Sequence, residues 1–360
     1  MSSIYYFYPK YKTTSFSVIA QQHIRYLSRR VNIFEFDIDF YSSIYWAPGK
    51  RILVHPIFYS FIGLEKAKAE KALRKLYRLR NVASRLGGFD VADTDRISET
   101  AVELANRFDL IIVPSTFAKE AYVRSGVEIP VEVLPHGIPE EFQVPVKKIT
   151  NKTIKELYKF KREKKAIFIL YFLWHSGFRK GADVLAAAIE QVFNEFDNVY
   201  LIIKRMETED PYLKELRGPR TREIATFLSW DELRQLYDIC DIAVVPSRGG
   251  GFELNALEAI SRGLITIVPE AGPFLDYIQY TIPFRVKGRV KIFEDNPVHV
   301  GYGWDPDPED LARKIIFAID NLQKLRTTFA NFALEIRTKY SWAKICNRLY
   351  SILLKYGFVG

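Results

Sequence analysis

Short runs of apolar residues alternate along the first 142 residues with segments whose apolar positions recur every three or four residues. The runs are typical of buried strands, and the segments between them are typical of helices. The predicted strands are IYYFY, VNIFEFDI, RILVHPIF, DLIIVPS and VEVLPHG, and the predicted helices are FSVIAQQHIRYLSRR, SETAVELANRF and Thr116 to Arg124. This alternation favours an α/β domain built around a parallel sheet.

The alternation starts again after residues 143–165, a polar and basic stretch with Pro145 that we interpret as a linker. Beyond it, the predicted strands are AIFILYFLW, VYLIIKR, DIAVVPS and LITIVPE, and the predicted helices run from about Ala182 to Phe196, over Asp231 to Ile239 and after the glycines of SRGGG. We therefore predict two doubly wound parallel-sheet domains, residues 1–145 and 160–341, that face each other across a cleft.

A glycine triplet lies where the strand DIAVVPS gives way to a helix, within SRGGGFELNALEAISRGL. Helix N-termini carry unpaired N–H groups and the positive end of the helix dipole, which together attract anions. In open parallel sheets, ligands also bind beyond the carboxyl ends of the strands. Glu258 stands one turn into this helix among apolar neighbours. We therefore expect an anion at the glycines, and a polar group such as a diol at the carboxylate of Glu258.

Composition narrows the class of protein. Of the 360 residues, 48% are hydrophobic, which is enough for two cores, and no apolar run reaches the 18 or so residues that a bilayer crossing needs. The start, MSSIYYFYPK, is a strand pattern rather than a signal peptide. Cys240 and Cys346 lie far apart without metal-ligand spacing, which favours a reducing compartment. We expect a cytoplasmic protein.

The formal net charge of +9 indicates an anionic partner, and much of it lies in residues 64–80 and 151–165. In residues 64–80, helical spacing separates two faces, an apolar one with Leu73, Leu76 and Tyr77 and a basic one with Lys68, Lys71, Lys75 and Arg78. Such a helix either lies on an anionic membrane surface, with the protein peripheral on the inner face of the membrane, or packs on its own domain with its charges solvated. Nucleic-acid binding is not expected, because no recognised binding module accompanies the charge.

Five segments of the chain form a further pattern: VPSTFAKEAYVRSGV, VLPHGIPEEF, HSGFRKGADVLAAAI, LSWDELRQLYDICDIAVVPSRGGGFELNALEAISRGL and YSWAKICNRLYSIL. In this order they resemble the GT-B-fold retaining glycosyltransferases of family 4 (glycosyl transferases group 1). The resemblance covers nearly the whole chain and is most specific from Ile167 to Pro273. It implies a Rossmann-like acceptor-binding domain, a Rossmann-like nucleotide-sugar-binding domain, and a C-terminal helix, residues 342–360, that crosses back to complete the first.

The resemblance also implies that the anion is the diphosphate of a nucleotide-sugar, such as a UDP-, GDP- or ADP-sugar. Glu258 would accept hydrogen bonds from the ribose hydroxyls, and Lys180 would stabilise the β-phosphate as the main electrostatic catalyst. The family has an arginine about five residues before this lysine, where this chain has His175, so Arg179, His175 or Arg205 would share its role. The other implied donor-site positions are Gly249, Gly250, Gly251, Phe252 and Leu254. GT-B enzymes generally hold the diphosphate with protein cations, so neither a metal ion nor a cofactor is expected.

The chain departs from the family pattern at Gly250, where the first of two glutamates, the one that usually contacts the transferred sugar, would stand. Glu253 follows three residues later, where the family generally has glycine. Either Glu253 supplies the sugar contact, or the sugar is held differently, or transfer is impaired. The loop from Lys10 to Ser15 also lacks the paired glycines common in the family, although Thr13, Thr14 and Ser15 offer donors there.

Polar residues of the first domain also follow predicted strands. His55 ends the strand RILVHP and is expected to face the cleft, where a histidine of this domain often contacts the sugar in the family. A buried histidine with a structural role is the alternative. Asp93 and Asp95, in VADTDRIS, would bind acceptor hydroxyls or cap the helix from Ser98.

We therefore expect a retaining, metal-independent glycosyltransferase that moves a sugar from a nucleotide-sugar to a hydroxyl of a glycan, a lipid-linked acceptor or a glycoprotein glycan. Its catalytic residues would be Lys180, His55 and Glu253, and the departing diphosphate would help to deprotonate the acceptor. One alternative is a nucleotide-sugar-binding protein that has lost transfer, which Gly250 motivates. A second alternative is a nucleic-acid-binding protein, which only the basic stretches motivate.

Overall fold

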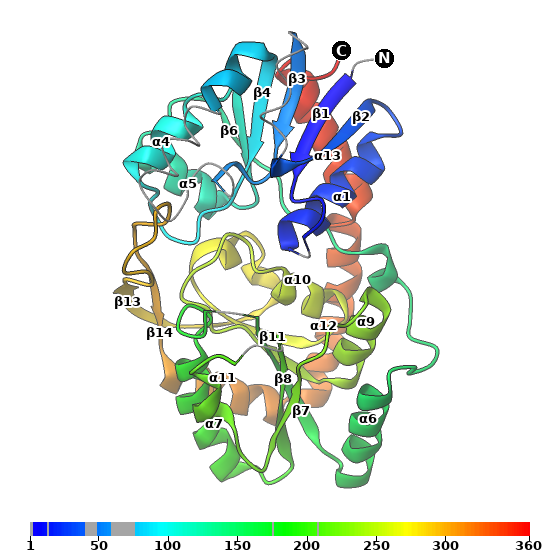
Figure 1. The fold of residues 1–360 in the computed structure, drawn as a ribbon. Coiled ribbons are helices and arrows are strands. Elements are labelled where there is room, and N and C mark those ends of the chain that lie inside the picture. Colours follow the sequence, from blue (N-terminus) through cyan, green and yellow to red (C-terminus); the bar gives the residue numbers. More distant parts are fainter. Residues whose placement is uncertain (1–2, 13, 40–48, 59–75, 175, 207–208) are drawn as a thin grey trace.

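The computed structural model describes residues 3–12, 14–39, 49–58, 76–174, 176–206 and 209–360. Two six-stranded sheets lie one above the other in Figure 1, and each is flanked by helices. All strand pairs within these two sheets are parallel. The predicted fold class, two doubly wound parallel-sheet units, is confirmed.

In the first sheet, the strands lie in the order β2-β1-β3-β4-β5-β6. The elements of this half are β1 (Ser3–Tyr8), α1 (Ser15–Leu27), β2 (Asn32–Asp37), β3 (Lys50–Val54), β4 (Ala83–Phe89), α4 (Glu99–Ala105), β5 (Leu110–Val113), α5 (Thr116–Ser125), β6 (Val131–Val133) and the 3-10 turn η2 (Glu140–Gln143). Because the strand order reverses between β1 and β3, the carboxyl ends of these two strands flank the switch point at which such sheets bind ligands.

The second sheet has the order β12-β11-β10-β7-β8-β9, which is that of a Rossmann fold. Its strands are β7 (Ile167–Leu173), β8 (Val199–Arg205), β9 (Thr221–Ile224), β10 (Ile242–Val244), β11 (Ile265–Pro269) and β12 (Ile282–Phe284). Its helices are α7 (Ala182–Glu195), α8 (Leu213–Leu216), α9 (Trp230–Ile239), α10 (Leu254–Ser261), α11 (Pro308–Asp320) and α12 (Leu322–Lys339), with 3-10 turns η3 (Gly272–Asp276) and η4 (Ile278–Tyr280). Here the switch point lies between β7 and β10.

The expected linker is in part a helix, α6 (Lys152–Lys164). Asn151 caps it by accepting a hydrogen bond from the N–H of Ile154 at 3.1 Å. Ile154 and Leu157 are buried, whereas most other positions of the helix are exposed and many are basic. Because so few positions are apolar, the sequence shows no clear helical periodicity here, and its polar composition is typical of a linker.

The chain ends in α13 (Trp342–Lys355), which follows α12 and runs beside α1 along the first half of the molecule (Figure 1). The indole of Trp342 packs edge-on against the ring of His23, with the ring centres 5.7 Å apart. Gly137 lies so close that a Cβ there would come within 2.4 Å of the indole. A helix that follows the second sheet in sequence therefore covers the first sheet.

A hairpin of β13 (Val286–Val290) and β14 (Gly303–Pro306) projects from the second half, and the segment that joins its strands lies on the first half (Figure 1). The N–H of Ser98 donates to the carbonyl of Val298 at 2.8 Å, and the N–H of Asp95 donates to the carbonyl of Tyr302 at 3.0 Å. The apolar pattern of the sequence does not predict this hairpin. It joins the two halves next to the turn that follows β10, since the N–H of Trp304 donates to the carbonyl of Arg248 at 2.9 Å.

Candidate functional site

Two turns meet at the switch point of the second sheet. One follows β7 and leads into α7, and the other, residues 245–253, follows β10 and leads into α10. We call residues 245–253 the glycine turn. Gly181, at the N-cap of α7, has a φ of +69°, and a Cβ there would lie 2.0 Å from the carbonyl oxygen of Pro246 in the other turn. Only glycine permits this approach. The sequence RKG therefore brings Lys180 next to the end of β10.

Arg248 ties the two turns together. Its guanidinium donates to both carboxylate oxygens of Asp183, at 2.6 and 2.7 Å, and to the carbonyl of Phe178 at 2.8 Å. Its backbone N–H donates to the carbonyl of Arg179 at 2.7 Å. A bidentate arginine–carboxylate pair fixes orientation as well as charge. The turn that carries Lys180 is therefore held in position by the protein itself.

Lys180 and Glu253 form the central ion pair of this region. The ammonium of Lys180 donates to the two carboxylate oxygens of Glu253 at 2.7 and 2.6 Å. Only 18% of the Lys180 side chain and 2% of the Glu253 side chain are exposed. Burial lowers the pKa of Lys180, and the carboxylate of Glu253 opposes that shift because it favours the charged form. A cation is thus kept beside the glycine turn, neutralised by a residue of the turn itself.

The carboxylate of Glu253 occupies the space beside Gly250. A Cβ at Gly250 would lie 2.3 Å from Oε1 of Glu253 and 3.2 Å from its carboxylate carbon. The backbone of Glu253 is left-handed, with φ +61° and ψ 69°, a conformation that glycine adopts at far lower cost than glutamate. A carboxylate therefore stands where a side chain of residue 250 would project, at the expense of a strained backbone at residue 253.

Arg179 is the second cation at the turn. Its Nη1 donates to the carbonyl of Gly249 at 3.0 Å, and it lies 3.8 Å from Oδ2 of Asp93 and 4.0 Å from Oε1 of Glu253. Asp93 belongs to the loop after β4, so this ion pair crosses between the two halves. Nowhere in the described part of the chain do three or more His, Cys, Asp or Glu side chains gather as a metal-binding group.

Loops of the first half lie directly on the glycine turn. A Cβ at Gly249 would lie 2.4 Å from the carbonyl oxygen of Asp93, and one at Gly251 would lie 2.6 Å from Cβ of Val91. The hydroxyl of Ser115 donates to the carbonyl of Gly251 at 2.7 Å. Within the described residues, the N–H groups of the three glycines donate to no carbonyl or side chain. The turn therefore presents donors that a phosphate can use.

Glu258 lies on α10 and is buried, with Tyr237 of α9 as its partner. The hydroxyl of Tyr237 donates to Oε2 of Glu258 at 2.8 Å. Burial raises the pKa of Glu258 to about 7, and the hydrogen bond from Tyr237 opposes that shift in part. Phe142 and Phe172 pack against the ring of Tyr237 at 5.6 and 5.5 Å between ring centres. Among the described residues, Glu258 forms no ion pair, so it differs from Glu253 in having no cation to neutralise it.

Phe252 and Leu254 anchor the turn in the hydrophobic interior. Phe252 is buried, and its ring packs edge-on against His136 at 4.9 Å between centres. Leu254 is half-buried and packs against the core cluster that runs through both halves. The carbonyl of Phe252 accepts a hydrogen bond from Tyr277 at 3.0 Å. The structure places both residues as supports of the turn.

His55 lies in a buried cluster of rings. Tyr6 Oη lies 3.1 Å from Nδ1 of His55 and 3.0 Å from Nδ1 of His23, and the ring of Phe89 stacks on His55 at 5.0 Å. Only 3% of His55 is exposed, and burial lowers its pKa well below the usual range, so the ring is neutral. The prediction that His55 faces an open cleft is wrong. The ring is enclosed by the side chains of α1, β1 and β4, as the structural alternative expects.

Arg205 is the last residue of β8 and is held by neighbours of that strand. Its Nε donates to Oε2 of Glu223 at 2.5 Å, and its Nη1 donates to the carbonyl of Met206 at 2.7 Å. Carboxylates on the β9 side of β8 therefore hold it, and a share in phosphate binding stays a prediction. His175 lies outside the described residues.

The polar residues of the first half serve local structure. Thr14 caps α1, accepting from the N–H of Ser17 at 3.3 Å, and Thr13 lies outside the described residues. The carboxylate of Asp95 accepts from the N–H of Tyr302 at 2.8 Å and pairs with Arg289. Ser98 is the N-cap of α4. Asp95 is thus occupied by the β13–β14 connection rather than open to an acceptor or used as the helix cap.

Sequence reasoning missed Tyr237, Arg248 and Ser115 as parts of this region. Tyr237 is on a different helix from Glu258, and no local spacing links the two. Ser115 is a helix cap in the sequence and reaches Gly251 only through the domain contact. Asp183 lies in HSGFRKGADVLAAAI and Arg248 lies in SRGGG, so the opposite charges of these two residues were the one sequence feature that could have indicated their pairing.

Of the basic stretch 64–80, only residues 76–80 are described, and Lys68, Lys71 and Lys75 lie outside them. Leu76 and Leu79 are buried in the core of the first half. The guanidinium of Arg80 pairs with the carboxylate of Asp109 at 3.0 and 3.1 Å. The described end therefore packs on its own domain. None of the described helices combines the length and the apolar character of a bilayer-crossing segment.

Comparison with known proteins supports one family. A family model described as glycosyl transferases group 1 matches residues 164–321, which include both turns. A putative glycosyltransferase of Sulfolobus islandicus filamentous virus (isolate Iceland/Hveragerdi) is 30% identical over 277 residues, which cover 74% of this chain and 73% of the relative. An uncharacterized protein of Sulfolobus islandicus rod-shaped virus 1 is 28% identical over 98% of this chain and 99% of its own length.

Solved structures share the fold at low sequence identity. HepE of Anabaena in complex with UDP-glucose matches with a TM-score of 0.72 and 16% identity, over 99% of this chain and 100% of that chain. Sucrose-phosphate synthase of Thermosynechococcus elongatus matches with a TM-score of 0.71 and 14% identity, over 99% of each chain. At these identities, the likeness concerns the two-sheet GT-B architecture.

Proposed function

This chain belongs to the group 1 glycosyl transferases, and on that premise we propose that it is a retaining, metal-independent enzyme that moves a sugar from a nucleotide-sugar to a hydroxyl acceptor. The observation that carries the proposal is the gathering of Lys180, Glu253 and Glu258 around the glycine turn at the switch point. HepE was solved with UDP-glucose, which supports a UDP-sugar as the first donor to test.

Donor binding uses the charges at the turn. The glycine N–H groups, Lys180 and Arg179 bind the diphosphate, and the carboxylate of Glu258 accepts hydrogen bonds from the ribose hydroxyls. An arriving diphosphate competes with Glu253 for the ammonium of Lys180. Release from that bidentate pair frees the Glu253 carboxylate for the hydroxyls of the sugar. Its position beside Gly250 supports this role and favours an active enzyme over a protein that only binds nucleotide-sugars.

The chemical step needs no enzyme nucleophile. The bond from the anomeric carbon to the diphosphate oxygen breaks, and the acceptor oxygen bonds to that carbon on the same face. The acceptor proton passes to a diphosphate oxygen as it leaves. Negative charge grows on the diphosphate in the transition state, where Lys180 meets it in a largely buried setting. His55, neutral and enclosed, has no part in this step.

A donor panel tests the proposal. UDP-, GDP- and ADP-sugars are screened for a rise in melting temperature, since a ligand that binds only the folded state stabilises it. The donor that binds is then incubated with hydroxyl acceptors with and without EDTA, and the anomeric configuration of the product is determined by NMR. Inversion or loss of activity in EDTA would contradict the proposal. Binding without transfer to any acceptor would favour the nucleotide-sugar-binding alternative.

The pH dependence of donor binding should report on Glu258. Because its pKa is about 7, the carboxylate is ionised above that pH and protonated below it. The ionised form is the stronger acceptor for the two ribose hydroxyls, so the affinity for UDP-glucose should fall as the pH drops through about 7. Glu258→Gln should bind about 1–3 kcal/mol more weakly at high pH and show no such pH step. Calorimetry with UDP-glucose, rather than UDP, avoids the titration of a terminal phosphate near pH 6.

The same group should make stability pH-dependent. The pKa of Glu258 is raised in the folded state, so its contribution to stability is fully present below the ordinary glutamate pKa and is lost as the pH rises through about 7. Burial also raises the pKa of Asp90 to about 7, so the comparison with Glu258→Gln isolates one group. Denaturant unfolding of both proteins across this range should show a shallower pH dependence for the variant. Parallel curves would mean that Glu258 does not titrate there.

An anionic membrane surface remains a proposed partner for residues 64–80. Each basic residue near such a surface adds roughly 1 kcal/mol of attraction, which salt screens. Reversing Lys68, Lys71, Lys75 and Arg78 to glutamate should abolish co-sedimentation with anionic vesicles and leave UDP-glucose affinity intact. If the unaltered protein does not sediment with such vesicles even at low salt, the stretch serves only its own domain.

A further inference from the structure

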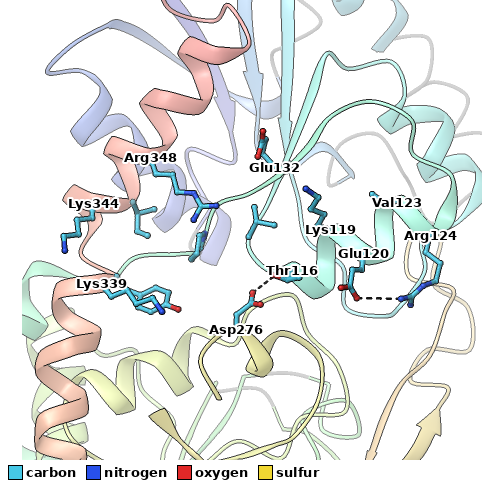
Figure 2. Close-up of a pocket in the computed structure, with 14 residues that line it drawn as sticks. Thr116, Lys119, Glu120, Val123, Arg124, Glu132, Asp276, Lys339, Lys344 and Arg348 are labelled. Carbon is cyan, nitrogen blue, oxygen red and sulfur yellow. Dashed lines mark hydrogen bonds and ion pairs between the residues drawn. The ribbon is translucent and has the colours of Figure 1, made fainter. Parts of the chain in front are cut away.

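A pocket lies between the two halves, away from the glycine turn, and has a volume of about 980 Å³ (Figure 2). Its walls come from α5 and β6 of the first half, from η3 and the end of α12 of the second half, and from α13. The N–H of Thr116 donates to Oδ2 of Asp276 at 2.9 Å across its lower edge in the figure. None of the residues of the glycine turn lines it. Its volume suits a small organic ligand.

The pocket carries an excess of positive charge that its own acids neutralise only in part. Five basic and three acidic residues line it. Glu120 pairs with Arg124, itself a lining residue, at 3.8 Å, and Asp276 accepts from Thr116. Glu132 pairs with Lys355 at 2.7 Å, and the charge of Lys119 also contributes to lowering the pKa of Glu132. Within the described part of the chain, Lys119, Lys344 and Arg348 form no ion pair, and Lys339 lies over tyrosine rings.

Lys119 and Arg348 are placed so that both can contact one anionic group of a ligand. Figure 2 shows Lys119 of α5 and Arg348 of α13 directed into the space from opposite sides, above the Thr116–Asp276 contact. A phosphate matches this arrangement, because it carries close to two negative charges and offers oxygens to a planar guanidinium and to an ammonium at once.

We propose that this pocket binds a phosphate-bearing ligand, held between Lys119 and Arg348, at a site separate from that of the sugar donor. A smaller hollow of about 540 Å³ adjoins it and shares Lys339 and Lys344. Its other lining residues are Tyr280, Leu334, Glu335 and Thr338, so the side chains of Leu334 and Tyr280 offer it an apolar surface. The organic part of the ligand lies toward this hollow. Because the cations come from α5 and α13 and the adjoining walls from α12, the bound ligand spans both halves of the molecule.

Calorimetric titration of inorganic diphosphate into the full chain at low ionic strength, with UDP-glucose present at saturation to occupy the donor site, tests the pocket. Lys119→Ala/Arg348→Ala should bind it at least about tenfold more weakly than the unaltered protein, as expected when charged hydrogen bonds are lost. The matched control is Lys324→Ala/Arg313→Ala, which removes the same two residue types from exposed positions on α12 and α11 outside the pocket. The control should bind as the unaltered protein does.

The source of the phosphate is distinguished by sedimentation with phosphatidylglycerol vesicles, with phosphatidylcholine vesicles for comparison. A loss of vesicle binding in Lys119→Ala/Arg348→Ala, but not in the control, would assign the phosphate to a lipid headgroup. Equal behaviour of the two double variants toward both diphosphate and vesicles overturns the proposal. UDP-glucose affinity, measured on the same proteins, should be unchanged in both, so a failure of the donor assignment is read separately from a failure of this site.

Discussion

Lys180→Ala should lower the turnover number about 100- to 1,000-fold, while the affinity for UDP-glucose changes far less. The physical reason is that the charge met by the ammonium grows as the bond to the diphosphate breaks, and the loss of one preorganised donor to such a charge has about this cost. Single-turnover kinetics at saturating donor measure the step directly. Equal losses in affinity and in turnover would mean that Lys180 binds the ground state as tightly as the transition state.

Removal of Lys180 also leaves a buried carboxylate behind, which needs a control. Glu253 then keeps only Arg179, at 4.0 Å, and the fold should lose up to about 3 kcal/mol of stability, at or below the usual cost of breaking a buried pair. Lys180→Ala/Glu253→Gln should recover most of this stability without recovering turnover. If turnover returned together with stability, the single variant would have been impaired by misfolding rather than by the loss of a catalytic charge.

An exchange of residues at positions 250 and 253 should have the second largest effect. Glu253→Gly should reduce turnover about 10- to 100-fold with the true donor, the scale of one hydrogen bond to a charged group, and leave UDP affinity nearly unchanged. Gly250→Glu alone places a second carboxylate against the first, since a Cβ at this position would lie 2.3 Å from Oε1 of Glu253. Gly250→Glu/Glu253→Gly should be more active than either single variant, because the carboxylate returns to the same space from an unstrained backbone.

Two readouts separate sugar binding from damage to the turn. UDP contains no sugar to be transferred, so its affinity should be similar in all three variants, and equal losses for UDP and UDP-glucose would point to a distorted loop. The double exchange should also be the most stable of the three, because it combines a glycine that adopts a φ of +61° at position 253 without strain with a carboxylate that still pairs with the buried Lys180. A double variant that is no more active than Glu253→Gly would show that residue 250 does not reach the sugar.

Several features of the site could be predicted from local sequence alone. The apolar runs that became β7, β10 and β11 place the glycine turn after a strand and before a helix. Gly181 after Lys180, and the triplet from Gly249, indicate turns that other backbone segments approach closely. A Cβ at Gly181 would lie 2.0 Å from the carbonyl oxygen of Pro246, and one at Gly249 would lie 2.4 Å from that of Asp93. Such signals are short-range: each depends on residues within one element and its caps. The resemblance to a known family added the expectation that the anion is the diphosphate of a nucleotide-sugar.

Other features depend on which elements the topology brings together. The pairing of Lys180 with Glu253 joins residues 73 positions apart, and the contact of Arg179 with Asp93 joins the two halves. Neither is visible as a spacing, because the strand order β12-β11-β10-β7-β8-β9 and the packing of the two halves decide them. The placement of the Glu253 carboxylate beside Gly250 is of the same kind. It follows from a left-handed backbone that no propensity favours for glutamate.

The burial of individual side chains was the property least predictable from the sequence. His55 follows a strand, which predicts a position at the cleft, yet α1 and the neighbouring strands enclose it. Residues 152–164 contain few apolar positions, which predicts a linker, yet Ile154 and Leu157 suffice to dock a helix. The sequence by itself determined where strands, helices and tight turns occur, because those depend on local periodicity and backbone sterics. The tertiary structure alone decided which charges meet and which polar groups are covered, because Coulomb energies and solvation depend on distance and exposure in space rather than on order along the chain.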